Sequence, residues 1–386
     1  MNITLSANSR IHRIAVSVFF FIAGLTVSSW ASRIPDIKEK LQLSEAALGG
    51  VLFALPVGQL VSLPLSGWLI SRFGSRQLVT AAAIFFPLTL ILLGCAATTW
   101  QLIAVLFFFG LWANLLNIAM NTQAVGVESL YGRSIMASFH GLWSLAGFCG
   151  AAVGNFFVSA DVSPLLHFSI ISLAAMLLVI TSFRNALPDD GNRKVSQPVL
   201  VKPDKTVLLL GLIAFCCMLC EGSMADWSGV YFQKVIQSPA AFNTLGYVAF
   251  MGTMATGRFF GDKLVTRFGV KRILELSGIL IAAGLMTVVL FTYLPSAIAG
   301  CLLVGFGVSC VVPMVYALAG KSTTMSPGLA LAAVSTISFV GFLVGPPVIG
   351  FIAQLAGLRW SFALIAVLGL GTALLGSKIK NLQTTF

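Results

Sequence analysis

The sequence predicts an all-α membrane protein with twelve transmembrane helices arranged as two pseudo-symmetric six-helix bundles. Hydrophobic residues make up 58% of the 386 positions and charged residues only 9%. A soluble domain carries roughly 25% charged residues, so most of this protein's surface must face lipid. The apolar runs are about 20 residues long, which is the helix length needed to cross roughly 30 Å of hydrocarbon. Inside lipid a helix satisfies its own backbone hydrogen bonds.

The apolar runs fall into two groups of six, separated by a polar linker. The first group comprises residues 11–31, 45–70, 77–97, 100–127, 134–159 and 164–183. The second group comprises residues 206–233, 242–262, 272–293, 297–320, 328–356 and 358–377. We therefore expect an N-terminal bundle over residues 1–183, a cytoplasmic linker over 184–205 and a C-terminal bundle over 206–386.

The basic residues predict the orientation of these segments. Of the 23 Lys and Arg residues, the predicted outer side receives only Arg33, Lys38, Lys40, Lys234 and Arg359. This asymmetry fits the positive-inside rule and places both termini in the cytoplasm. The net charge of +11 is then a topology signal and does not indicate a nucleic-acid partner. We expect a multi-pass protein of a bacterial inner membrane, with the lipid bilayer as its main surroundings.

An internal repeat relates the two halves. Arg72-Phe73-Gly74 recurs as Arg267-Phe268-Gly269, an offset of 195 residues, and the same offset pairs Gly110 with Gly305 and Gly150 with Gly345. Transporters built from two related halves bind their solute near the bilayer midplane between them.

The basic loops at Arg72 and Arg267 resemble the loop motif of the major facilitator superfamily. Several further strings resemble the YbjJ-like branch, which is related to fucose permease-type sugar transporters: Ser29-Trp30-Ala31-Ser32-Arg33-Ile34-Pro35, Met120-Asn121-Thr122-Gln123-Ala124, Ser138-Phe139-His140-Gly141, Asp226-Trp227-Ser228, Gly257-Arg258-Phe259-Phe260-Gly261-Asp262 and Gly345-Pro346-Pro347. The resemblance covers almost the whole chain. It implies a monomeric, alternating-access transporter that is often coupled to protons.

Polar residues inside a predicted span indicate function, because they are costly in lipid. Asn114, Asn117 and Asn121 are spaced i, i+3 and i+7, so they share one helix face. Such amides can bind a hydroxyl-rich solute, or they can join packed helices. Further candidates for solute contact are His140, Trp30, Gln59 and Trp227, each with a packing role as its alternative, while Arg33 is a candidate for the outer entrance or an interfacial anchor.

Two carboxylates in the seventh span are candidates for proton coupling. We expect Glu221 to be the main coupling group, with Asp226 nearer the outer end, and a structural hydrogen bond is the alternative. Both face one cavity only if the helix is distorted near Gly222. Arg258 and Asp262 are spaced i, i+4 and form a predicted structural or gating ion pair, to which the resemblance adds Arg72 and Arg267.

The sequence contains no complete Gly-x-x-x-x-Gly-Lys-Ser phosphate-binding loop, because Val315 stands where Gly320-Lys321-Ser322 would need the first glycine. It also contains no metal-spaced His/Cys cluster, and both observations argue against an enzyme or an ATP-driven pump. We therefore expect no cofactor, and a proton gradient as the driving force. The leading hypothesis is proton-coupled symport of a small polar solute, with a sugar or sugar-like molecule as one candidate. Efflux of drugs or amphiphilic metabolites and a non-transporting membrane sensor remain alternatives.

Overall fold

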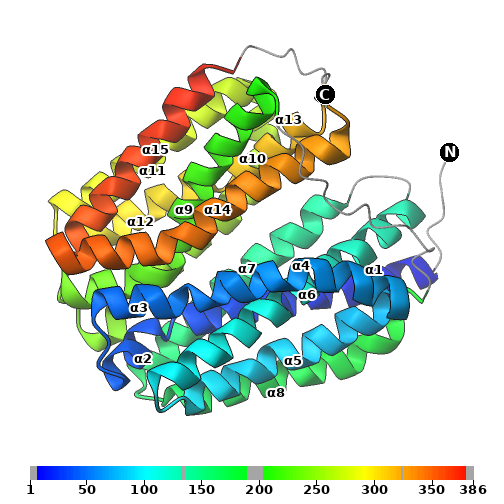
Figure 1. Ribbon diagram of the computed structural model, residues 1–386, viewed down its shortest axis with the longest axis horizontal. Coiled ribbons are helices and arrows are strands. Elements are labelled where there is room, and N and C mark those ends of the chain that lie inside the picture. Colours follow the sequence, from blue (N-terminus) through cyan, green and yellow to red (C-terminus); the bar gives the residue numbers. More distant parts are fainter. Residues whose placement is uncertain (1–6, 132–134, 189–202, 323–324, 380–386) are drawn as a thin grey trace. The chain divides into compact units, whose positions relative to one another are not determined.

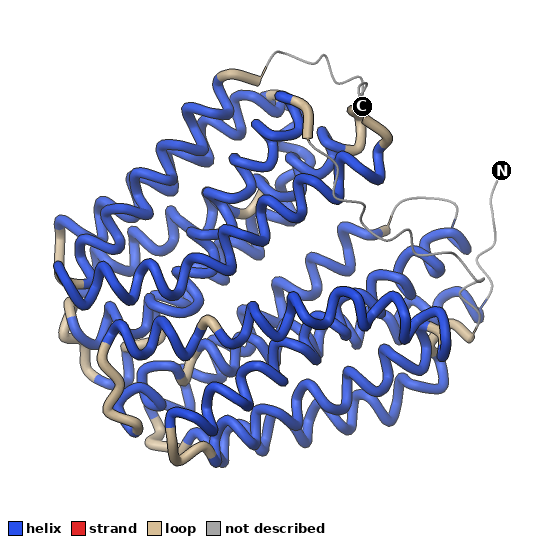
Figure 2. Tube along the Cα trace, in the orientation of Figure 1, coloured by secondary structure: helices blue, strands red, loops and turns tan. Residues whose placement is uncertain are grey.

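The computed structural model describes residues 7–131, 135–188, 203–322 and 325–379 (Figure 1). Throughout these ranges the regular secondary structure is helical (Figure 2). The chain divides into two compact units, which comprise Met1–Leu41 with Ala54–Gln197, and Gln42–Phe53 with Pro198–Phe386. Residues 42–53 therefore group with the second unit, although they precede most of the first one in sequence.

Unit 1 is a helical bundle around a core of fully buried phenylalanines that includes Phe19, Phe86, Phe109 and Phe168. Helices α1 and α7 pack together, as do α4 and α6, and α5 lies beside both α6 and α8 (Figure 1). Its elements are α1 (Ala7–Ala31), α2 (Ile34–Lys40), α4 (Ala54–Phe73), α5 (Ser75–Cys95), α6 (Thr99–Tyr131), α7 (Met136–Ser159), α8 (Pro164–Ser182) and the 3₁₀ turn η1 (Phe183–Asn185).

Unit 2 repeats this scheme around Trp227, Tyr231, Phe250 and Phe362, all fully buried. Helix α14 packs against α9, α10 against α12 and α11 against α15. Its elements are α3 (Glu45–Leu52), α9 (Lys205–Lys234), η2 (Ala240–Phe242), α10 (Leu245–Phe268), α11 (Val270–Leu290), α12 (Leu294–Val308), α13 (Val311–Ala319), α14 (Pro327–Ala356) and α15 (Leu358–Ser377).

The short helix α3 is held in unit 2 by close packing and one ion pair. A Cβ on Gly49 would lie 2.6 Å from the carbonyl oxygen of Pro346, so only glycine permits this approach to α14. The Lys234 ammonium lies 2.9 Å from the Glu45 carboxylate. Ser44 caps the helix by accepting a hydrogen bond from the backbone N–H of Ala47.

Eleven helical stretches in the described residues are long and apolar enough to cross a membrane. Helix α10 is not among them, but its 24 residues span about 36 Å at 1.5 Å per residue. Its sequence carries Arg258, Asp262, Lys263 and Arg267, which lower its hydropathy. With α10, the described helices account for the twelve predicted segments.

Two predicted segments, 45–70 and 297–320, are each divided into two helices. The first breaks at Phe53 and the second at Ser309 and Cys310. Each break lies three or four residues before a proline, Pro56 or Pro313. A proline lacks the N–H that would bond the carbonyl four residues earlier, and its ring clashes with that carbonyl. A proline in the sequence does not by itself predict such a break, because Pro64 and Pro87 lie within unbroken helices.

The predicted repeat is visible in the helix packing of the two units. A Cβ on Gly110 would lie 1.9 Å from the carbonyl oxygen of Leu55, and one on Gly305 would lie 2.1 Å from that of Phe250. Leu55 and Phe250 are themselves separated by 195 residues. Gly74 and Gly269, with φ of 81° and 79°, make the same left-handed corner before α5 and α11.

Candidate solute and coupling site

The three amides on α6 have two different surroundings. Asn114 donates hydrogen bonds to the carbonyl oxygen of Gln59, at 3.1 Å, and to Oγ of Ser62, at 2.7 Å. These bonds join α6 to α4, which is the packing role that the sequence left open. Asn117 is exposed, and its backbone and side-chain oxygens both accept from Asn121, at 2.8 and 3.0 Å. In the described residues the Nδ2 of Asn117 has no partner, so it can donate to a solute.

Gln59 and Trp30 lie within the packing of unit 1. Trp30 is 2% exposed, and its ring centroid lies 6.2 Å from that of Phe109. Its indole Nε1 and the side-chain oxygen of Gln59 are buried, without a hydrogen-bond partner among the described residues. Trp30 therefore presents no surface to a solute in this conformation, whereas Gln59 is half-buried.

His140 has a different position, on an exposed part of α7. Its ring meets that of Phe20 edge-on, with centroids 5.2 Å apart. Among the candidates in unit 1, His140 and Asn117 are therefore the groups that are open to a solute.

Glu221 on α9 is paired with Arg258 on α10. The carboxylate oxygen and the guanidinium nitrogen are 3.8 Å apart, and the two side chains are 17% and 16% exposed. A distance of 3.8 Å is an ion pair but too long for a hydrogen bond. The pair is therefore loose and partly accessible, although it lies between two membrane-spanning helices.

Asp226 and Trp227 do not join this pair. Helix α9 runs unbroken from Lys205 to Lys234, so Glu221 and Asp226, five residues apart, point about 140° apart. The distortion near Gly222 that would bring them to one cavity is absent from this helix. Asp226 is half-buried, whereas Trp227 is fully buried.

The predicted pair of Arg258 with Asp262 stays a prediction, because the side chain of Asp262 lies outside what the structure describes. The described partner of Arg258 is Glu221. Arg72 lies over the rings of Trp68 and Phe73, at 5.5 and 5.6 Å, and Arg267 lies over the ring of Phe268 at 5.4 Å. All three contacts are cation–π interactions. The one with Trp68 joins residues four apart on one helix face, and the other two join neighbours in sequence.

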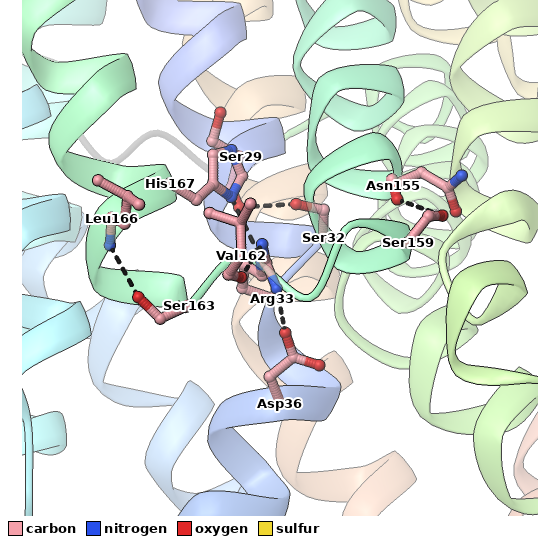
Figure 3. A network of polar contacts seen from close by, with 10 residues as sticks. All are labelled: Ser29, Ser32, Arg33, Asp36, Asn155, Ser159, Val162, Ser163, Leu166 and His167. Atoms are coloured by element: carbon pink, nitrogen blue, oxygen red, sulfur yellow. Dashed lines mark hydrogen bonds and ion pairs between the residues drawn. The ribbon is translucent and has the colours of Figure 1, made fainter.

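Arg33 lies in a buried polar network at one end of unit 1 (Figure 3). Its Nη1 donates to the Asp36 carboxylate at 2.6 Å, its Nε to Nδ1 of His167 at 3.1 Å and its Nη2 to the carbonyl oxygen of Val162 at 2.8 Å. Burial raises the pKa of the Asp36 carboxyl, and the Arg33 guanidinium opposes that shift.

The Arg33 network joins the corner between α1 and α2 to α8. Because Arg33 is 2% exposed and anchored by these three bonds, its side chain is not open to solvent in this structure. Sequence reasoning gave His167 no role. Of the partners of Arg33, only Asp36, three residues later, could have been found from a local sequence pattern, because His167 is 134 residues away.

Comparison with known proteins agrees with this architecture. The family model of the Major Facilitator Superfamily matches residues 16–327 and 244–380. An uncharacterised MFS-type transporter of Yersinia pestis is 34% identical over 361 residues, covering 94% of both chains. An uncharacterised transporter of Sinorhizobium fredii is 30% identical over 370 residues, covering 95% of this chain and 97% of the relative.

Two solved structures show the same fold. The nucleoside transporter NupG aligns over 96% of this chain and 98% of its own, with a TM-score of 0.73 and 13% identity. A bacterial homologue of the human lysosomal transporter Spinster aligns over 96% of this chain and 97% of its own, with a TM-score of 0.76 and 13% identity. The chain belongs to the Major Facilitator Superfamily. It is a multi-pass membrane transporter.

Proposed function

We propose that this protein is a proton-coupled symporter that takes up a small polar solute across a bacterial inner membrane by alternating access. Both termini lie in the cytoplasm, and the functional unit is a monomer. The sugar-like class of solute and the branch related to fucose permease-type transporters belong to this proposal. The observation that carries it is the loose Glu221–Arg258 pair inside the membrane-spanning part of unit 2.

Charged side chains inside a membrane carry a free-energy cost. An ionised residue at the centre of a span costs about 2.5–3.5 kcal/mol on insertion scales. A pair kept only for packing would gain most from short, bidentate hydrogen bonds. Glu221 and Arg258 instead remain 3.8 Å apart and partly exposed. Protonating Glu221 therefore breaks one long contact and no short hydrogen bond to Arg258, which suits a group that must exchange its proton in every cycle.

The amides of α6 support a neutral polar solute. Asn117 is exposed and offers a donor that has no partner within the described part of the chain, and Asn121 fixes its orientation from one turn away. Neutral donors and acceptors favour hydroxyl or carbonyl groups over a lipophilic cation. A likeness in fold to a nucleoside transporter is compatible with this class of solute but does not identify it.

The first experiment is a thermal-shift screen of the purified protein against sugars, nucleosides, organic acids and amphiphilic cations. A solute that binds the native state raises its stability, by about 2.7 kcal/mol at 100 times its Kd. We expect stabilisation by a neutral polar solute, which is lost in Asn117→Ala and retained in Asn155→Ala, an amide on α7. A response confined to lipophilic cations would overturn the uptake proposal and favour efflux. No response to any compound would favour the sensor.

A further inference from the structure

The segment that follows α8 is held by side chains from three other helices of unit 1. It comprises residues 184–187, and we refer to it as the docked segment. Its Ala186 is fully buried, whereas Pro188 is exposed. The docked segment forms the start of the connection between the two units.

Three side chains, from His12, Arg76 and Gln123, make polar contacts with the backbone of the docked segment. The Nδ1 of His12, on α1, lies 2.7 Å from the carbonyl oxygen of Asn185. The Nη2 of Arg76, on α5, donates to the carbonyl oxygen of Arg184 at 2.9 Å. These bonds reach backbone atoms only, so they fix the path of the segment whatever side chains it carries.

Gln123, on α6, makes the most extensive contact. The backbone N–H of Leu187 donates to its Oε1 at 2.7 Å, and its Nε2 donates to the carbonyl oxygen of Leu187 at 3.1 Å and to Oγ of Ser75 at 2.7 Å. Gln123 is fully buried, and a buried amide without such partners would be strongly destabilising. The docked segment therefore completes the hydrogen bonding of an interior residue.

The side chain of Leu187 also packs against Gly126 and would have to shift if that residue had a Cβ. A Cβ on Gly126, one turn after Gln123, would lie 2.7 Å from the Cδ2 of Leu187. Leu187 is therefore held by two residues of α6, through hydrogen bonds with Gln123 and apolar packing against Gly126.

The second half of the repeat lacks most of these groups. At the offset of 195 residues, His12 corresponds to Val207, Gln123 to Leu318 and Gly126 to Lys321, whereas Arg76 corresponds to Lys271, which is also basic. The half that leads into the linker carries the full set of docking groups, and the half that leads to the C-terminus keeps only the basic residue. Shared ancestry of the two bundles does not account for that difference.

We propose that the adjoining ends of α1, α5 and α6 form a binding site for the chain's own residues 184–187. The site holds the docked segment throughout the transport cycle. Unit 1 then moves as one body, and the connection to unit 2 leaves it from a fixed point at Leu187. This function is independent of the solute and of proton coupling.

Hydrogen exchange of the Leu187 amide tests the site in the full-length protein, with single-residue resolution by electron-transfer fragmentation. We expect the Leu187 amide to be protected both with and without a bound solute. Gln123→Met keeps the size of the side chain but removes both amide bonds, and should accelerate exchange at Leu187 at least 10-fold. Gln77→Met, the same change at an exposed position of α5, should leave the rate unchanged.

A second variant separates a lost contact from a folding defect. Gly126→Val leaves Gln123 intact but fills the space of the Leu187 side chain, and it should also accelerate exchange at Leu187 while the mid-helix amides of α6 stay protected. Exchange of Leu187 at the rate of an unstructured peptide in the unaltered protein would overturn the proposal. Unchanged protection in both Gln123→Met and Gly126→Val would do so as well.

Discussion

The two units share their helix packing but differ in their polar residues. Gly110 and Gly305 admit the same backbone approach at equivalent positions. Asn117 and Asn121 correspond instead to Val312 and Tyr316, and Glu221 and Arg258 correspond to Thr26 and Leu63. Neutral amides are thus a feature of unit 1, and the membrane-spanning charge pair is a feature of unit 2. The repeat therefore specifies the scaffold, whereas the amides and the charge pair, to which we assign solute binding and proton coupling in our proposal, lie in different units.

The largest expected effect follows from breaking the charge pair. Arg258→Met leaves the Glu221 carboxylate without its cationic partner in a low-dielectric region, and should lower the free energy of unfolding by about 3 kcal/mol. Adding Glu221→Gln should recover about 1 kcal/mol. Equilibrium unfolding in mixed detergent micelles measures both values. A double variant as unstable as Arg258→Met alone would show that the pair is not coupled.

The shared scaffold can be tested at its two equivalent glycines. Gly110→Ala and Gly305→Ala each place a Cβ near 2 Å from a backbone oxygen, and each should cost about 2 kcal/mol of stability. Gly67→Ala is the control, because its Cβ would meet nothing within 4 Å. The same unfolding titration compares all three. A large loss in only one of the two glycine variants would contradict equivalent packing.

The difference between the two kinds of amide can be sharpened within α6. Asn114→Leu removes two hydrogen bonds to α4 and should lower the free energy of unfolding by about 1.5 kcal/mol, with solute affinity retained. Asn117→Leu should do the reverse and weaken the binding of a polar solute at least 10-fold, at little cost in stability. Isothermal titration and thermal unfolding separate the two effects. Equal loss of affinity in both variants would remove the distinction.

The smallest expected effect concerns the anchor at Arg33. His167→Phe removes the acceptor of the Arg33 Nε but keeps a ring beside Phe157, and should cost about 1 kcal/mol. Thermal unfolding should show this loss, while solute affinity stays unchanged. A change in affinity larger than 3-fold would instead place Arg33 and His167 in the solute path.

The sequence predicted the helices because their signal is local. Apolar runs and basic loops indicated the spans, and the Arg-Phe-Gly repeat indicated two related halves. The contacts of Arg33, Arg258 and Gln123 were not predictable in the same way. The partner of Arg258 that the structure describes, Glu221, lies on a different helix, α9. Such partners depend on how helices far apart in sequence are packed, which periodicity does not encode.

Solute-induced proton uptake tests the central claim most directly. Proteoliposomes loaded with a pH-sensitive dye would receive the polar solute identified in the thermal-shift screen, and internal acidification would be recorded. We expect acidification with the unaltered protein and with Glu275→Gln, a carboxyl variant on α11. Glu221→Gln should abolish acidification but still exchange labelled solute. Acidification by Glu221→Gln with the same number of protons per solute would contradict the assignment of Glu221 as the coupling group.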